Sequence, residues 1–171
     1  MKQMIGISSQ HRYRSPNKGD GAKIWSLVRD SGKLDVNSPY FYITMSHWFS
    51  DSCMIVEDIN SDALIGVVIG FRQPEHCDRL FIWQITVDQN YRGQGIALKL
   101  LDELTCQSGA DYVEATISPS NASSRRLFEK WAAMKKADIT KSEGFGIELF
   151  PEYAHEKEDL YVIGPLKNIE S

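Results

Sequence analysis

Residues 80–101 read in succession as a buried strand, a turn with two glycines and an amphipathic helix, and this unit limits the architectures open to the chain. Aromatic and β-branched side chains predominate over residues 80–87, which predicts a strand with little solvent on either face. Apolar side chains then recur at helical spacing, which predicts a helix over residues 96–108. Gly93 and Gly95 lie immediately before that helix. The junction between strand and helix is therefore the first place to search for a site.

The first turn of such a helix favours anions. Several amide N–H groups there lack intrahelical partners, and the helix dipole makes that end electropositive. Gly93 and Gly95 have no Cβ atom, so an anion such as a pyrophosphate can approach the backbone closely. The turn is not a P-loop, because no Gly-Lys-Ser/Thr follows, and it lacks the third glycine of the dinucleotide-binding fingerprint. An ordinary strand–helix turn without a ligand remains the alternative on this spacing alone.

The turn also resembles a known motif. Its sequence, Arg92-Gly93-Gln94-Gly95-Ile96-Ala97, is similar to the coenzyme A pyrophosphate loop of the GNAT superfamily of N-acetyltransferases, and residues 118–128 resemble the segment that opens the following helix there. The resemblance implies an α/β (α+β) fold, with a mixed, mostly antiparallel sheet flanked by helices, and acetyl-CoA as cosubstrate. It implies that acetyl-CoA binds at Ile85, Thr86, Val87, Arg92, Gly93, Gln94, Gly95, Ile96, Ala97, Asn121 and Ser124. Asn121 can equally be the N-cap of the helix that follows it.

Composition argues against several other classes of protein. The 171 residues are most simply one domain, and a net charge of −4 with scattered basic residues favours neither nucleic acid nor an anionic membrane as a partner. Residues 1–13 lack the apolar core of a signal peptide, and no apolar run is long enough to span a bilayer. Cys53, Cys77 and Cys106 have no metal-like spacing and fit a reducing compartment. We therefore expect a cytoplasmic protein without a metal.

Taken in order, the chain predicts strands and helices in a mixed arrangement. Residues 1–9 are expected to be a flexible N-terminus, and residues 10–171 a single domain. Apolar periodicity and turn residues predict strands at residues 10–14, 53–57, 64–71, 80–87, 112–117, 145–150 and 160–163, and helices at residues 21–31, 39–49, 96–108 and 122–135. This order predicts a largely antiparallel sheet with helices on both faces and one parallel strand pair near the centre.

One position departs from the superfamily pattern. Many GNAT enzymes carry a tyrosine as general acid one helical step past the asparagine motif, whereas this chain has Phe128 there. Phenylalanine cannot donate a proton, so the leaving thiolate must be protonated by solvent, by another side chain or by the amine's own proton. The general acid therefore stays unassigned.

Four stretches resemble one family within the superfamily, the L-2,4-diaminobutyrate acetyltransferases, which catalyse the second step of ectoine synthesis. These are residues 34–40, 81–87, 116–124 and 155–165, and the similarity covers roughly residues 13–166. The Asp-x-Asn-Ser and His-Glu-x-Glu segments carry the most weight, because they are uncommon in other acetyltransferases. The resemblance implies transfer of acetyl from acetyl-CoA to the 4-amino group, giving N4-acetyl-L-2,4-diaminobutyrate.

Such a substrate is a zwitterion with a second ammonium group, so its pocket needs anionic side chains and donors for one carboxylate. Asp35 is expected to bind an ammonium group, with Asn37, Ser38 and Tyr40 of the same segment around the substrate; a helix-capping turn is the alternative. Trp83 is expected to form a wall of the pocket, and a plain core tryptophan is its alternative.

His155, Glu156 and Glu158 form the richest cluster of titratable side chains. In a strand, Glu156 and Glu158 would share one face while His155 points the other way. Acetyl transfer requires an unprotonated amine, so we expect Glu158, supported by Glu156 or His155, to accept the proton from the 4-amino group directly or through water. A solvated run of charges is the alternative.

Two other functions remain open on the sequence. One is a GNAT enzyme for another small amine or a protein amine. An enzyme for protein amines would favour an open groove over a polar cage, and the segments around Asp35 and Glu158 count against it. The other is a non-catalytic module that binds acetyl-CoA, which the retained acidic cluster does not fit. Aromatic residues over residues 40–49 can supply apolar surface for a two-fold contact, so a homodimer is expected.

Overall fold

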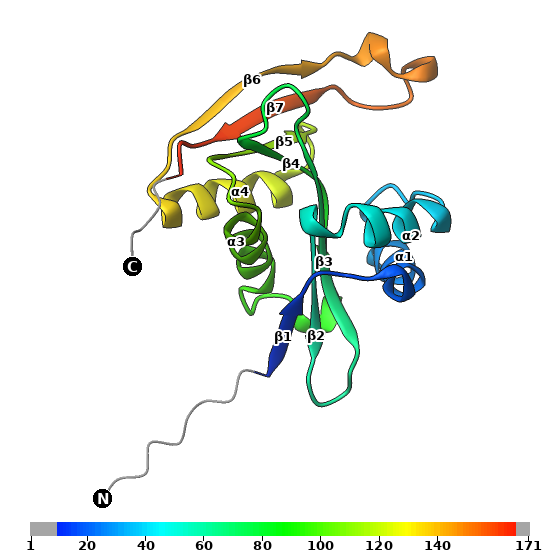
Figure 1. Ribbon diagram of the computed structural model, residues 1–171. Helices are drawn as coiled ribbons and strands as arrows, with labels where there is room; N and C mark the ends of the chain where they lie inside the picture. Colours follow the sequence, from blue (N-terminus) through cyan, green and yellow to red (C-terminus); the bar gives the residue numbers. More distant parts are fainter. Residues whose placement is uncertain (1–9, 167–171) are drawn as a thin grey trace, which may run out of the picture.

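The computed structural model describes residues 10–166, and these residues form a seven-stranded sheet with helices on both faces (Figure 1). The strands are β1 (His11–Arg14), β2 (Cys53–Asp58), β3 (Leu64–Arg72), β4 (Arg79–Val87), β5 (Tyr112–Ile117), β6 (Ile139–Phe145) and β7 (Glu158–Ile163). The helices are α1 (Gly21–Ser31), α2 (Pro39–Trp48), α3 (Ile96–Ser108) and α4 (Ala122–Lys135). The strand order is β1-β2-β3-β4-β5-β7-β6, and every neighbouring pair is antiparallel except β4 and β5. The predicted mixed, mostly antiparallel sheet is confirmed.

Two apolar cores lie on opposite faces of the sheet. Along β2, Cys53 and Ile55 pack with α1 and α2, while Met54 and Val56 pack with α3 and α4. Successive side chains of a strand point to opposite faces, so a sheet covered on both sides requires an unbroken apolar run. This double coverage explains why β2, β3 and β4 are apolar without alternation.

The single parallel pair separates toward its carboxyl end. Residues of β4 pair with β5 only from Arg79 opposite Tyr112 to Ile82 opposite Ala115. Beyond Ile82, β4 continues to Val87 beside β3 alone, and β5 continues to Ile117 beside β7 alone. The backbone groups of β4 that face β5 are therefore free of a strand partner over residues 83–87. An extended ligand can hydrogen-bond to this edge of β4 as a neighbouring strand would.

One predicted strand is wrong. Residues 145–150 were expected to be extended, but β6 ends at Phe145 and is followed by the short 3₁₀ helices η4 (Ile147–Leu149) and η5 (Pro151–Tyr153). Strand β6 is an edge strand whose side chains are mostly exposed, so its sequence lacks the apolar signal that marks a buried strand. The expected flexible segment at residues 1–9, and residues 167–171 of the expected single domain, lie outside the described residues.

No helix within residues 10–166 is both long enough and apolar enough to cross a membrane.

Candidate active site

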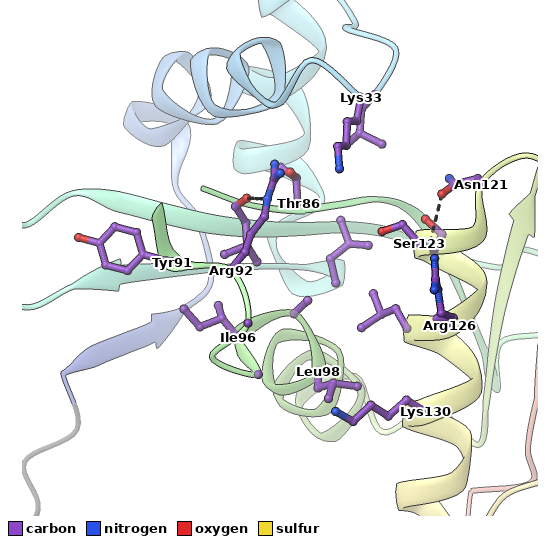
Figure 2. A pocket seen from close by; sticks show the side chains of 18 residues that line it. Lys33, Thr86, Tyr91, Arg92, Ile96, Leu98, Asn121, Ser123, Arg126 and Lys130 are labelled. Carbon is purple, nitrogen blue, oxygen red and sulfur yellow. Dashed lines mark hydrogen bonds between the residues drawn. The ribbon is translucent and has the colours of Figure 1, made fainter. Parts of the chain in front are cut away.

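A cavity of about 420 Å³ lies between the end of β4 and the N-terminal ends of α3 and α4 (Figure 2). The turn before α3 places Gly93 at φ +78° and Gly95 at φ +77°, in the left-handed region that glycine tolerates best. Gly95 is the N-cap of α3 and has no side-chain cap, so the amide groups of the first helical turn are available to a ligand. The geometry is that of an anion site at a helix N-terminus.

The charge around this cavity supports the same reading. The cationic side chains of Lys33, Arg92, Arg126 and Lys130 line it, and no aspartate or glutamate within residues 10–166 does so. Figure 2 shows Arg126 and Lys130 projecting from α4, whereas Lys33 comes from the loop after α1. The whole chain carries a net charge of −4, so this local excess of positive charge is a property of the site. A ligand with several phosphates matches it.

The predicted cofactor residues converge on this cavity with one exception. Those that line it are Ile85, Thr86, Val87, Arg92, Gly93, Gly95, Ile96, Ala97, Asn121 and Ser124. Gln94 is exposed and is not among the lining residues. Arg92 is oriented by the hydrogen bond that its Nε donates to the carbonyl oxygen of Val87, at 3.2 Å.

Asn121 has the capping role that the sequence left open. Its Oδ1 accepts a hydrogen bond of 3.1 Å from the backbone N–H of Ser124, which makes it the N-cap of α4. It also lines the cavity, so a contact with the cofactor remains a prediction for this residue. Because Oδ1 serves the helix, the Nδ2 group is what Asn121 can offer to a ligand.

A second cavity, of about 1010 Å³, adjoins the first. Lys33, Leu34 and Asn121 line both cavities, so they mark the boundary between them. The walls of the second cavity come from β4, β5, β6, β7 and the segment of residues 150–158. The two cavities meet where β4 and β5 separate. A ligand bound along β4 can therefore extend from the first cavity into the second.

His155 connects two carboxylates in the second cavity. Its Nε2 lies 3.7 Å from Oδ2 of Asp35 and 3.8 Å from Oε1 of Glu158. Its ring stacks on Phe150 with centroids 4.5 Å apart, and its Nδ1 lies 2.6 Å from the carbonyl oxygen of Glu156. A carbonyl oxygen only accepts, so Nδ1 carries the hydrogen and Nε2 faces the carboxylates. Three of the residues predicted from the sequence are thus brought together.

Glu158 has the properties of a proton acceptor. Its side chain is largely buried, and this desolvation raises the pKa of its carboxyl above the ordinary value. The nearby imidazole of His155 and a hydrogen bond with Thr116 oppose that rise, and Glu156 and Asp159 add to it. A carboxylate with a raised pKa is a stronger base than an exposed one.

Glu156 lies before β7 and not in a strand. Strand β7 begins at Glu158, two residues before the predicted strand, so Glu156 and Glu158 do not share the strand face that was considered for them. Glu156 accepts a hydrogen bond from the hydroxyl of Ser120, in the turn before α4. It therefore faces that turn, and it is not among the residues that line the second cavity.

The residues predicted to bind the substrate divide into two groups. Asp35 and Trp83 line the second cavity, and Trp83 is 47% exposed, so it is not a core tryptophan. Asn37, Ser38 and Tyr40 do not line it. The hydroxyl of Ser38 caps α2 by accepting from the N–H of Phe41 at 3.3 Å, and Tyr40 is 72% exposed.

Several residues of the two cavities were not singled out by the sequence. Arg126 and Lys130 lie four residues apart in α4, a spacing that could have identified them as one face of the predicted helix. Gln84 and Glu114 are buried polar residues in otherwise apolar strands, which is an informative signal in itself. Lys33 carries no local signal, because only the fold brings its loop to the cavity.

The general acid is not supplied by a tyrosine at the usual place. Phe128 is 3% exposed and packs in the core between α3, α4 and the sheet. Tyr91 lines the first cavity, but its hydroxyl is hydrogen-bonded to Oδ2 of Asp58 at 3.0 Å.

Within residues 10–166, no group of three or more His, Cys, Asp or Glu side chains could hold a metal ion.

Comparison with known proteins agrees with this geometry. Residues 22–133 match the model of the acetyltransferase (GNAT) family. The chain is 45% identical to an L-2,4-diaminobutyric acid acetyltransferase from Halalkalibacterium halodurans, over 88% of this chain and 80% of that protein. It is 41% identical to the enzyme of that name from Marinococcus halophilus, over 90% and 89% of the two chains.

A solved structure is similar over nearly the whole chain. Diaminobutyrate acetyltransferase EctA from Paenibacillus lautus, in complex with its substrate L-2,4-diaminobutyric acid and coenzyme A, has 40% sequence identity and a TM-score of 0.86. The match covers 96% of this chain and 100% of that one. These similarities confirm the predicted fold class and the predicted class of acetyl-CoA-dependent acyltransferase. The chain therefore belongs to the acetyltransferase (GNAT) family and, within it, to the group of the L-2,4-diaminobutyric acid acetyltransferases.

Proposed function

We propose that this protein transfers acetyl from acetyl-CoA to the 4-amino group of L-2,4-diaminobutyrate, the step of ectoine synthesis that the sequence resemblance implies. The observation that carries the proposal is the group formed by Asp35, His155 and Glu158 in a cavity that adjoins the cationic one at Asn121. Phosphates of the cofactor occupy the cationic cavity, and the ammonium groups of the diamino acid match the carboxylates of the other.

The reaction follows from this arrangement. Pantetheine runs along the free edge of β4, so the thioester lies at the boundary between the cavities. The 4-amino nitrogen attacks the thioester carbonyl carbon, and backbone N–H groups at residues 85–87 stabilise the oxyanion. Glu158 accepts the amine proton directly or through one water. The C–S bond then breaks, and the coenzyme A thiolate takes a proton from solvent, from another side chain or from the amine, since Phe128 cannot supply one.

A direct assay tests the proposal. The protein is incubated with acetyl-CoA and, separately, L-2,4-diaminobutyrate, L-ornithine, L-2,3-diaminopropionate and a peptide with a free N-terminus, while free thiol is followed. We expect the largest kcat/KM for diaminobutyrate, with acetyl on N4 in the NMR spectrum of the product. A preference for the peptide would favour a protein-amine acetyltransferase. Binding of acetyl-CoA without turnover of any amine would favour the non-catalytic module.

We also infer that two chains pair through the aromatic surface of α2 and the residues after it. Tyr40, Trp48 and Phe49 are 72%, 69% and 46% exposed, and exposed aromatic side chains of this density mark interaction surfaces. Sedimentation at micromolar concentration is expected to give about twice the 19.4 kDa of one chain. Trp48→Glu should shift the mass toward one chain, whereas Leu149→Glu, at an equally exposed position on η4, should not. A single-chain mass for the unmodified protein rejects the dimer.

The three cysteines support a reducing, cytoplasmic setting. Cys53, Cys77 and Cys106 carry free thiols in the structure. Burial of Cys53 raises the pKa of its thiol to about 11, which keeps it protonated and unreactive at neutral pH.

A further inference from the structure

We infer that Gln84 is a positioning residue that holds the Asp35 loop, residues 33–37, in place over the boundary between the two cavities. The inference rests on the proposed function, because Asp35 is taken to contact the diamino acid. It adds a residue of the second cavity whose side chain sets the position of Asp35.

The hydrogen bonds of Gln84 join three elements. Its Nε2 donates to the carbonyl oxygen of Asp35 at 2.6 Å, and its Oε1 accepts from the hydroxyl of Tyr42 at 3.0 Å. The same hydroxyl accepts from the backbone N–H of Asn37 at 3.2 Å. Gln84 is 7% exposed and Tyr42 is fully buried. The middle of the loop and its C-terminal end are therefore tied, through two buried side chains, to β4 and α2.

A bulge in β4 makes this arrangement possible. In the pairing of β3 with β4, Ile69 lies opposite Gln84 and Gly70 lies opposite Ile82, so Trp83 is an extra residue. A bulge lets two successive side chains project on the same face of a sheet. Trp83 accordingly packs against Phe41 while Gln84 reaches Tyr42, both on the side of α1 and α2.

The Asp35 loop has few other restraints. Within the described residues, the loop backbone makes three hydrogen bonds. Two belong to this network, and in the third the N–H of Lys33 donates to the hydroxyl of Ser31 at 3.5 Å. The side chain of Asp35 is 95% exposed, so packing does not fix it. Lys33 and Leu34, in the same loop, line both cavities. Without Gln84, the distance between Asp35 and His155 is no longer determined.

Gln84 also links the two substrates. Its backbone belongs to the part of β4 that continues past β5, immediately before Ile85, where pantetheine is proposed to lie. Its side chain holds the loop that carries the proposed contact for the amine. One residue therefore joins the edge proposed for the acetyl donor to the loop proposed to bind the amine.

The test uses Gln84→Met, which keeps the length of the side chain and removes both hydrogen bonds. We expect the KM for diaminobutyrate to rise about tenfold or more, because a lost buried hydrogen bond frees the loop that presents Asp35. The KM for acetyl-CoA should stay unchanged, and kcat should fall by less than about threefold. In an Asp35→Ala background, Gln84→Met should add no further rise, because its effect passes through Asp35.

A matched control separates positioning from general loss of stability. Ser46→Ala removes another buried hydroxyl of α2, which donates to the carbonyl oxygen of Tyr42 at 2.7 Å and does not contact the loop. It should leave both KM values unchanged. Should Gln84→Met fail to fold, Gln84→Glu keeps the acceptor for Tyr42 and loses the donor to Asp35, and Tyr42→Phe removes the hydroxyl alone; both are expected to raise the same KM.

Hydrogen exchange distinguishes failure of this inference from failure of the proposed function. The Asn37 amide should exchange faster in Tyr42→Phe and Gln84→Met than in Ser46→Ala, whichever amine the enzyme acetylates. If the unmodified protein does not acetylate diaminobutyrate, the proposed function fails and this measurement still decides on the loop. An unchanged Asn37 exchange rate, or an unchanged KM for diaminobutyrate in a folded Gln84 variant, overturns the inference.

Discussion

Replacing Glu158 by glutamine is expected to lower kcat by a factor of about 10² to 10⁴, the range that general base catalysis contributes. Glutamine keeps the shape of the side chain but cannot accept the proton that the 4-amino group loses. Acetyl-CoA binding should be unaffected, because Glu158 lines the second cavity and not the cationic one. Steady-state kinetics with both substrates varied, together with calorimetric titration of acetyl-CoA, measure the two effects separately.

The pH profile gives an independent readout of the same residue. Burial raises the pKa of Glu158, so on acidification its carboxylate is protonated at a higher pH than an exposed glutamate would be. The active form is the carboxylate, so kcat should fall as the pH drops through this raised pKa. In Glu158→Gln this acidic limb should disappear. Activity should partly recover at high pH, because the free-amine fraction of a simple alkylammonium with a pKa of about 10.4 increases there.

A carboxylate in this cavity can also act by binding the substrate's ammonium group, so the two roles must be separated. A binding residue raises KM with little change in kcat, whereas a base lowers kcat. Glu143→Gln is the matched control, because it removes one negative charge from the same cavity wall. It should change kcat by no more than a few-fold. An unaltered kcat at neutral pH in Glu158→Gln would show that Glu158 is not the base, and Asp35 and His155 would be the next candidates.

Replacing Gly95 by valine is expected to weaken acetyl-CoA binding roughly ten- to hundredfold, equivalent to losing hydrogen bonds to a charged group worth about 1.5–3 kcal/mol. Gly95 lines the cationic cavity and stands at the start of α3, where the first amide groups face the ligand. A valine side chain there obstructs the approach of the pyrophosphate to the backbone. Isothermal titration with acetyl-CoA measures the loss.

Backbone strain must be separated from this obstruction, because Gly95 has a φ of +77° that a β-branched residue rarely adopts. Gly109, at the other end of the same helix, has a φ of +62° and equally open space around its Cβ position. Gly109→Val should therefore cost similar thermal stability and leave acetyl-CoA affinity unchanged. Arg92→Ala should weaken binding less than Gly95→Val. Unchanged affinity in folded Gly95→Val would refute the assignment of this turn to the pyrophosphate.

Local residue types were sufficient for much of the fold. The strand–turn–helix unit that ends at α3 was predictable because strand preference, the glycines of the turn and helical periodicity are all properties of neighbouring residues. Both faces of the central strands are buried, so their continuous apolar runs also predicted these strands from the sequence. Strand β6 was missed for the opposite reason: an exposed edge strand has no burial pattern to reveal it.

The sequence by itself determined the parts of the site that are contiguous, above all the turn of residues 92–97 at the N-terminus of α3. Tertiary structure alone decided that Asp35 and Glu158 both lie near Nε2 of His155. It also decided that Lys33 and Arg126 line the same cavity. These groups come from separate elements, and strand register and helix packing place them together. Gln84 belongs to this second class, since a bulge in β4 turns it toward Tyr42 and the Asp35 loop. No local pattern encodes such contacts, because they depend on which segments the two cores hold side by side.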